Sequence, residues 1–234
     1  MNMDFMRYEF RIKEDLLPRI IPDKHIIVDL ETTGLEPPED IIICGGIFDC
    51  KKRIIRIYFL PDPKKHENFK RFLRNTILWY KNEGYEIWAY NSEFEEDFLS
   101  LRNVIRDLMV YWICKPIPFE ERDEFTLRRT KMTTATDEII LDILKDKETM
   151  KRIDEISNGY VSSSLIPRIY LKQWLLKRDD EAVRQIVHHN YIDLIREYFA
   201  LWFIYKSIRD IKRLIAKEFY IIPREIIRAL DRIL

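Results

Sequence analysis

Short apolar runs dominate the first half of the chain, whereas the second half repeats its apolar residues at helical spacing. Apolar runs and strict alternation predict strands, and spacings of three and four residues predict amphipathic helices. We expect strands at 5–12, 25–30, 41–49, 53–60, 86–90 and 108–114. We expect helices at 64–82, 92–106, 120–131, 137–157, 167–177, 179–205, 206–218 and 223–234. Strands that come before helices in this order predict an α/β sheet with helices packed on it.

The turns between the early strands indicate how these strands pair. Lys51 and Lys52 form a plausible hairpin tip, so the segments 25–30, 41–49 and 53–60 are expected to form an antiparallel meander. The chain has no internal repeat and no low-complexity linker. We therefore expect one domain with three parts. These are an N-terminal arm (1–24), the main α/β domain (25–205) and a helical extension packed on the same domain (206–234).

Composition restricts the class of protein without naming a function. Hydrophobic residues make up 47% of the 234 residues and only five are glycine, which argues against a disordered or fibrous chain. The formal net charge is zero, so any nucleic-acid binding must come from local clusters of Lys and Arg. The three cysteines form no C-x-x-C pair, which predicts no zinc site and suits a reducing compartment. With no apolar leader and no spanning segment, we expect a cytoplasmic protein without a membrane partner.

Two carboxylates one residue apart follow the apolar strand at 25–30. In a strand, side chains i and i+2 point to the same face, so Asp29 and Glu31 are expected to converge. Carboxylates aimed at one point repel each other unless a cation lies between them, and oxygen ligands suit Mg²⁺ or Mn²⁺. The segment Thr32-Thr33-Gly34-Leu35 then turns the chain.

A second acidic segment begins where the strand at 86–90 ends. Asn91 is followed at once by a predicted helix, which would present a side chain at the rim of the sheet. Glu95 and Asp97 both lie on this helix, about 200° apart around its axis, so only one can point inward. The pattern of apolar residues on the helix favours Glu95.

A third segment combines acid and histidine on one helix. His189 and Asp193 are four residues apart and therefore share a helix face. A histidine beside a metal-binding carboxylate can accept the proton of an attacking water, because its pKa is near neutrality. His188 would take this role if the helix began irregularly, and Asn190 would position neighbouring groups.

These three segments resemble the motifs of a known enzyme group. The run from Asp29 to Leu35 closely resembles the first motif of the DEDD 3′–5′ exonucleases, a branch of the ribonuclease H-like fold. The segment from Asn91 to Leu99 resembles the second motif, with Glu95 where Asp is usual. The segment from His188 to Asp193 resembles the third motif, most closely in the YprB-like (ribonuclease H-like type 2) predicted exonucleases. The resemblance covers about residues 25–205.

The resemblance implies a fold, a reaction and a set of roles. The fold would be a ribonuclease H-like mixed sheet with an antiparallel three-stranded start, then parallel strands, and flanking helices. The activity would be two-metal hydrolysis of phosphodiester bonds at a DNA or RNA 3′ end, with His189 or His188 as the base. Mg²⁺ or Mn²⁺ would be held by Asp29, Glu31, Glu95 and Asp193. The substrate would be bound by Thr32, Thr33, Gly34, Leu35, Asn91 and Asn190.

Two other functions use the same segments. A catalytically degenerate nucleic-acid-binding module is suggested by Glu95 in place of Asp and by the neutral net charge. A structure-selective endonuclease of the same fold would use the same carboxylates. The sequence does not indicate a protein partner.

Overall fold

The computed structural model describes residues 4–18, 23–109 and 147–218 and the isolated positions 132, 136, 137 and 140. At its centre is a six-stranded sheet in the order β1-β4-β3-β2-β5-β6. The strands are β1 (Met6–Arg11), β2 (His25–Thr32), β3 (Ile42–Asp49), β4 (Ile54–Phe59), β5 (Glu86–Ala89) and β6 (Ile105–Asp107). Pairing is antiparallel from β1 through β4 and β3 to β2, and parallel from β2 through β5 to β6. The predicted antiparallel meander followed by parallel strands is confirmed.

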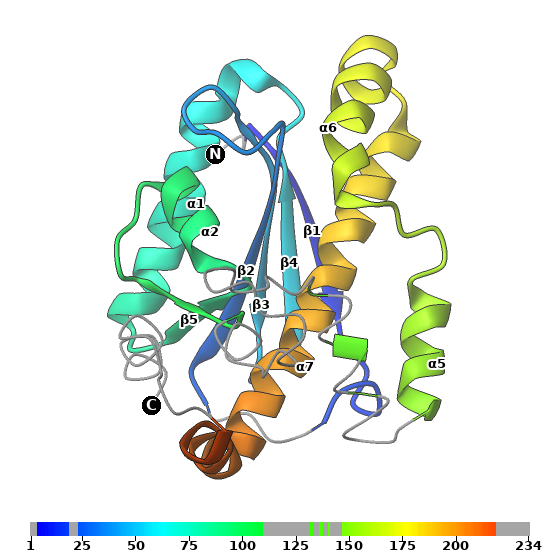
Figure 1. Ribbon diagram of the computed structural model, residues 1–234. Helices are drawn as coiled ribbons and strands as arrows, with labels where there is room; N and C mark the ends of the chain where they lie inside the picture. The colour runs from blue at the N-terminus through cyan, green and yellow to red at the C-terminus, as the bar shows by residue number, and fades with distance from the viewer. Residues whose placement is uncertain are drawn as a thin grey trace.

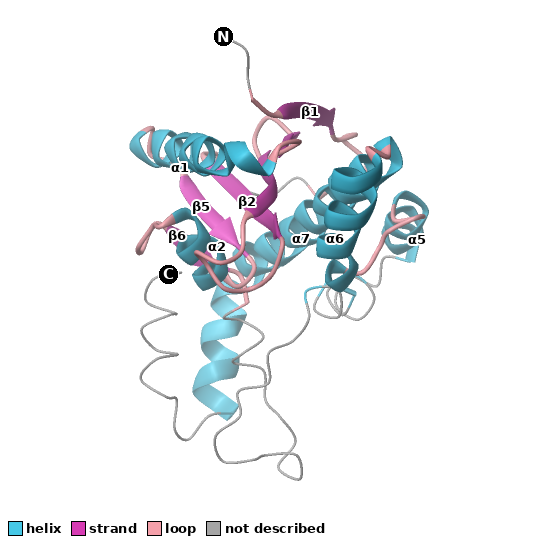
Figure 2. Ribbon diagram, turned by 90° about the horizontal axis from the view of Figure 1, so that it is seen from above, coloured by secondary structure: helices cyan, strands magenta, loops and turns pink. Residues whose placement is uncertain are grey.

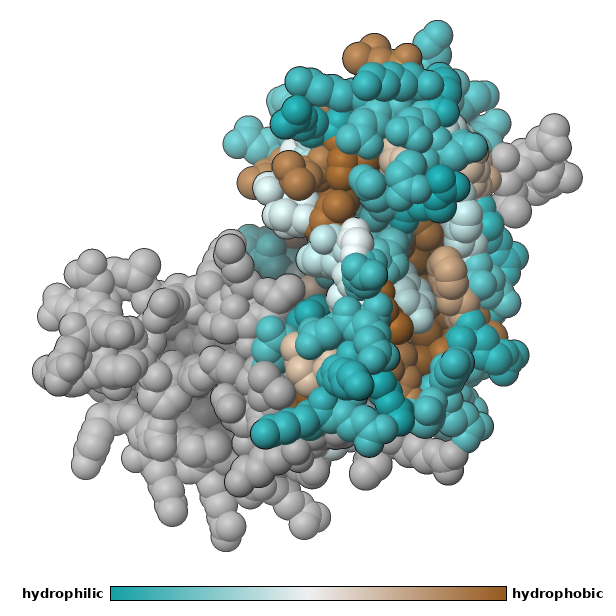
Figure 3. All heavy atoms as spheres, turned by 90° about the vertical axis from the view of Figure 1, so that its right-hand side faces the viewer, coloured by the Kyte–Doolittle hydropathy of each residue, from teal (hydrophilic) through white to brown (hydrophobic). Residues whose placement is uncertain are grey.

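Helices cover both faces of this sheet (Figure 1). They are η1 (Pro63–Lys65), α1 (His66–Asn82), α2 (Ser92–Leu99), α5 (Lys147–Ile156), η4 (Ser163–Leu165), α6 (Ile166–Arg168), η5 (Ile169–Leu175, a π-helix) and α7 (Asp180–Glu218). Figure 3 shows the side of the molecule that carries α5 and α6, where hydrophobic residues reach the surface between hydrophilic borders.

Alternation along β2 separates two cores. Ile26, Val28 and Leu30 are buried in a cluster with residues of α1. Ile27 belongs to the other cluster, which α7 completes. Figure 2 shows the sheet lying between α1 and α7. Since side chains alternate along a strand, Asp29 and Glu31 lie on the same face as Ile27 and therefore face α7.

The region after β5 differs from the expected helix at 92–106. Helix α2 ends at Leu99, because Ser100 adopts a left-handed conformation (φ 52°). The Glu96 carboxylate then accepts the backbone N–H groups of Val104 and Ile105 at 2.6 and 2.8 Å, which turns the chain into β6. The expected strand at 108–114 is therefore replaced by a strand at 105–107, and residues 110–114 lie outside the described part.

Helix α7 is longer than expected. The sequence predicts a break between helices at 179–205 and 206–218, but one helix runs from Asp180 to Glu218. No glycine or proline occurs in this range to interrupt it. The boundary set at 205 therefore falls inside a helix. No helix in the described part of the chain is both long and apolar enough to cross a bilayer. The helices expected at 120–131 and 223–234 lie outside the described residues.

Candidate metal centre

The C-terminal half of β2 presents two carboxylates to α7. Glu31 is only 6% exposed, and Asp29 is half-buried beside it on the same face. The pairing register with β3 shifts between Glu31 and Thr32, so the regular ladder ends directly after the second acid. The two side chains therefore converge at the end of the strand, as their spacing predicts.

Helix α7 brings a histidine and a third carboxylate against Glu31. The Nε2 atom of His189 lies 3.2 Å from Oδ2 of Asp193 and 3.6 Å from Oε1 of Glu31. The other ring nitrogen, Nδ1, lies 2.8 Å from the carbonyl oxygen of Val161. Because a carbonyl only accepts, Nδ1 is the donor, and in the neutral ring the Nε2 lone pair faces both carboxylates. One ligand atom from each of the three residues lies within 4.8 Å of the others, which suits a shared metal ion.

His188 points elsewhere. Its Nε2 atom lies 2.6 Å from the carbonyl oxygen of Ile156, at the end of α5. Helix α7 is already regular at this position, since it begins at Asp180. Of the two candidate histidines, the structure therefore places His189 against the carboxylates.

Asn190 is fully buried and holds Asp29. Its side-chain amide donates to Oδ2 of Asp29 at 2.6 Å and to the backbone carbonyl of the same residue at 3.1 Å. Gly46 lies opposite Asp29 in β3, and a Cβ at Gly46 would collide with Oδ1 of Asn190. The glycine thus gives Asn190 room to reach Asp29. Gly46 is not among the site residues predicted from the sequence, although glycine inside a strand signals a close approach of another group.

Tyr160 is a second residue that the sequence did not reveal. Its hydroxyl donates to Oδ1 of Asp193 at 2.9 Å, and its ring stacks on His189 with 4.6 Å between centroids. Burial and the Asp193 charge raise the pKa of Tyr160 far above its usual value, so the hydroxyl remains a donor. A single tyrosine in a loop carries no pattern that would distinguish it from other aromatic residues.

Helix α2 contributes one buried carboxylate. Glu95 is 2% exposed, whereas Asp97 is exposed. The helix begins after Asn91, which adopts a left-handed conformation (φ 70°) and whose backbone N–H donates to Asp107 at 3.0 Å. Burial and the charge of Asp29 raise the pKa of Glu95 well above its usual value. The acid of α2 that faces the site is therefore Glu95.

The turn after β2 is held by its own side chains. Thr32 donates through its hydroxyl to the carbonyl of Gly34, and Thr33 donates to Oδ1 of Asp40 at 3.0 Å. A side chain at Gly34 would collide with the Asp40 carboxylate. The turn leaves Leu35 with 79% of its surface exposed. The predicted substrate-binding turn is thus a fixed loop that presents an apolar side chain to solvent.

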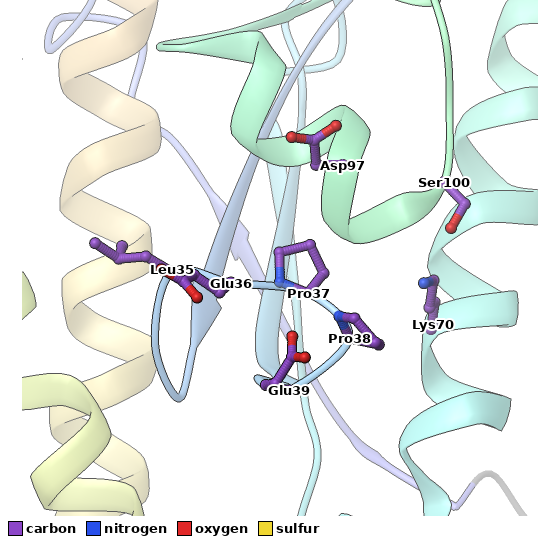
Figure 4. Close-up of a pocket in the computed structure, with 8 residues that line it drawn as sticks. All are labelled: Leu35, Glu36, Pro37, Pro38, Glu39, Lys70, Asp97 and Ser100. Atoms are coloured by element: carbon purple, nitrogen blue, oxygen red, sulfur yellow. The ribbon is translucent and has the colours of Figure 1, made fainter.

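A pocket of about 610 Å³ lies beside this turn (Figure 4). It is lined by Leu35, Glu36, Pro37, Pro38, Glu39, Lys70, Asp97 and Ser100. Three acids against one lysine make the pocket an unfavourable place for a phosphate group. We therefore do not assign the phosphate backbone of a nucleic acid to it.

The acids of the site lie closer together than their charges favour. Burial and neighbouring carboxylates raise the pKa values of Asp29 and Glu31 well above the usual range. Burial also raises the pKa of Asp193, against the lowering effect of His189 and Tyr160. Among the described residues, Oε1 of Glu31 and Oε2 of Glu95 have no hydrogen-bond partner although both atoms are buried. Buried carboxylate oxygens without a hydrogen-bond partner fit a divalent metal ion, which would compensate their charge.

One more buried acid, Glu197, lies a helical turn beyond Asp193. It is 1% exposed, and its Oε1 atom accepts the backbone N–H of Tyr90 at 3.1 Å. Glu197 is not among the site residues predicted from the sequence, because an acid between an arginine and a tyrosine has no motif of its own. Only the four-residue spacing from His189 through Asp193 to Glu197 could have revealed it.

Comparison with known protein families identifies the family of the chain. A family model of the RNase_H superfamily matches residues 26–208, which is well over half of the chain. The matched range includes β2 from its second residue onward, α2 and the part of α7 that carries His189 and Asp193. The chain matches no curated protein.

Proposed function

The chain belongs to the RNase_H superfamily, and on this premise we propose that it is a metal-dependent 3′–5′ exonuclease acting on DNA or RNA. The mixed sheet flanked by helices is consistent with the ribonuclease H-like fold. Membership in the superfamily suggests a nuclease with a nucleic-acid substrate. The observation that carries the proposal is the convergence of Glu31, His189 and Asp193 within 4.8 Å.

The metal ligands in this proposal are Asp29, Glu31, Glu95 and Asp193, which would hold two Mg²⁺ or Mn²⁺ ions. Bound divalent ions make water a stronger nucleophile and stabilise charge on the leaving 3′ oxygen. The unpartnered oxygens of Glu31 and Glu95 support this assignment, because a cation would satisfy them.

The protein groups around the ligands have separate tasks. In the proposed reaction, Nε2 of His189 accepts the proton of the attacking water. The Val161 carbonyl holds the imidazole in the required tautomer through Nδ1. Tyr160 and Asn190 donate to Asp193 and Asp29 and thereby fix the rotamers of these two carboxylates.

The preference for a 3′ end rests on the turn after β2. The resemblance of this turn to the first motif of the DEDD exonucleases, and of the α7 segment to the YprB-like third motif, supports exonuclease action. The exposed side chain of Leu35 offers an apolar surface on which a terminal base can pack. Thr32 and Gly34, which fix the turn, would hold Leu35 in place.

Product analysis tests the proposal. Single-stranded DNA and RNA labelled at the 5′ end are incubated with the protein in Mn²⁺, Mg²⁺ or EDTA and separated on a sequencing gel. A ladder of shortened products that requires metal is the expected result. One discrete internal product would replace the exonuclease by a structure-selective endonuclease. Binding without cleavage in every metal would favour a degenerate binding module.

A further inference from the structure

Glu197 is buried where a charged side chain is costly. It lies on α7 at the third position of the series His189, Asp193 and Glu197, four residues apart, so it points to the same side of the helix. Its neighbours Leu194 and Phe199 are fully buried. A carboxylate is retained in such surroundings only where something compensates its charge or its lone pairs.

One carboxylate oxygen of Glu197 has a hydrogen-bond partner within the protein. Oε1 accepts the backbone N–H of Tyr90 at 3.1 Å. Strand β5 runs parallel to β2 with Trp88 beside Ile27, so Tyr90 lies at the level of Asp29. The contact with Tyr90 therefore brings Glu197 to the strand level that carries the first acid of the site.

The second carboxylate oxygen of Glu197 has no hydrogen-bond partner in the part of the chain that the structure describes. Oε2 of Glu197 is buried and has no partner among the described residues, and the same holds for Oε2 of Glu95. A purely structural role at Tyr90 would need one acceptor and no charge, and an amide would supply it. These two carboxylate oxygens, one on α2 and one on α7, each lack the compensation that a buried charge needs, and a cation would supply it.

We propose that Glu197 is a metal ligand, which together with Asp29 and Glu95 forms a second cation position next to that of Glu31 and Asp193. The inference rests on the proposed function, because it takes the site to bind two divalent ions. Burial and then the charges of Asp29 and Glu95 raise the pKa of Glu197 well above its usual value. Three carboxylates are an oxygen-only ligand set, which suits Mg²⁺ or Mn²⁺.

Counting bound ions tests this assignment. Free Mn²⁺ is measured by electron paramagnetic resonance while the full-length protein is titrated, for the wild type and for Glu197→Gln. The glutamine keeps an acceptor for the Tyr90 N–H and nearly the same volume, but it removes the charge. We expect two Mn²⁺ ions on the wild type. On the variant we expect one ion at unchanged affinity and a second ion weakened by about tenfold or more.

The outcomes separate this inference from the nuclease proposal. Two ions bound by Glu197→Gln with wild-type affinities would overturn the role of Glu197 and leave the proposed nuclease standing. No Mn²⁺ binding by the wild type would overturn both. The control is Asp97→Asn, which removes an exposed carboxylate from α2 and should leave both ions in place.

A second variant excludes a mere loss of folding. Glu197→Asp keeps the charge but shortens the side chain, so it should retain the second ion better than Glu197→Gln does. If Glu197 only accepts the Tyr90 N–H, the ranking of the two variants reverses. Glu197→Gln then binds the second ion more tightly than Glu197→Asp and also melts at a higher temperature. That reversed ranking would overturn the inference.

Discussion

The side-chain amide of Asn190 donates to the Asp29 carboxylate at 2.6 Å and also to the Asp29 backbone carbonyl at 3.1 Å. These two residues are separated by most of the chain, yet the contact fixes both the rotamer of the acid and the distance between β2 and α7. Groups that orient a metal ligand tune its affinity for the ion.

Asn190→Ala should weaken metal binding while Asp29 itself is unchanged. Without the amide, Asp29 loses its fixed rotamer, and we expect the affinity for Mn²⁺ to fall by about 10–100-fold. Calorimetric titration with Mn²⁺ measures this change. Asn75→Ala, an exposed change on α1, is the control and should bind Mn²⁺ like the wild type. Equal affinities for wild type and Asn190→Ala would show that the contact does not act on the metal.

Gly46→Ala should damage the same contact from the opposite strand. The added methyl would collide with Asn190 and with Leu194, so we expect a loss of about 1–3 kcal/mol in the free energy of unfolding. Gly45→Ala is matched to it, because a methyl there meets Leu73 and Leu30 on the other face of the sheet. Denaturant unfolding and Mn²⁺ titration of both variants should show weakened metal binding for Gly46→Ala alone. Weakening of equal size in both variants would contradict this account.

The two adjacent histidines should differ in their effect on catalysis. His189 faces Glu31 and Asp193, whereas His188 contacts the Ile156 carbonyl. Removing a general base costs about 10²–10⁴-fold in rate, so His189→Ala should lose this much. His188→Ala should stay within about tenfold of the wild type, since it loses no group of the site. Single-turnover cleavage rates of both variants show which histidine is the general base. A larger loss of rate for His188→Ala than for His189→Ala would reverse the assignment of the base to His189.

The crowded acids determine how stability depends on pH in the absence of metal. The pKa values of Asp29, Glu31 and Glu95 are raised in the folded protein, so above the usual carboxyl pKa of about 4 the folded state holds more protons than the unfolded state. The free energy of unfolding contributed by these groups therefore falls as the pH rises through the raised pKa values. Melting temperatures in EDTA between about pH 5 and about pH 8 should show a smaller decrease for Glu95→Gln than for the wild type. The same slope for both proteins would contradict the pKa shift of Glu95.

Local spacing predicted much of the fold, and long-range contacts decided the rest. Apolar runs located β2 and β3, but no glycine marked the end of α2, where Ser100 takes the left-handed conformation. The chain then turns because the Glu96 carboxylate accepts the backbone N–H groups that start β6. A side chain that accepts from residues eight and nine positions later leaves no periodic trace in the sequence.

The residues of the site also fall into those that local spacing predicts and those that only long-range packing reveals. Spacings of two and four residues predict that Asp29 shares a face with Glu31, and His189 with Asp193, and the structure places both pairs so. Tyr160 and Glu197 escaped prediction, because their hydrogen-bond partners lie more than 30 residues away along the chain. Which residues surround a short motif depends on tertiary packing, and for Tyr160 the spacing of the motif carries no information about it.

The central claim is that this acidic site hydrolyses phosphodiester bonds with metal ions, and Asp29→Ala tests it most directly. Cleavage of 5′-labelled single-stranded DNA and RNA is followed for wild type and variant in Mn²⁺ and in EDTA. We predict that the wild type shortens one or both substrates in Mn²⁺ only. The folded variant should show no cleavage, with a melting temperature in EDTA equal to or above that of the wild type, because a like charge is removed. Near-normal cleavage by Asp29→Ala, or cleavage by the wild type in EDTA, would contradict the claim.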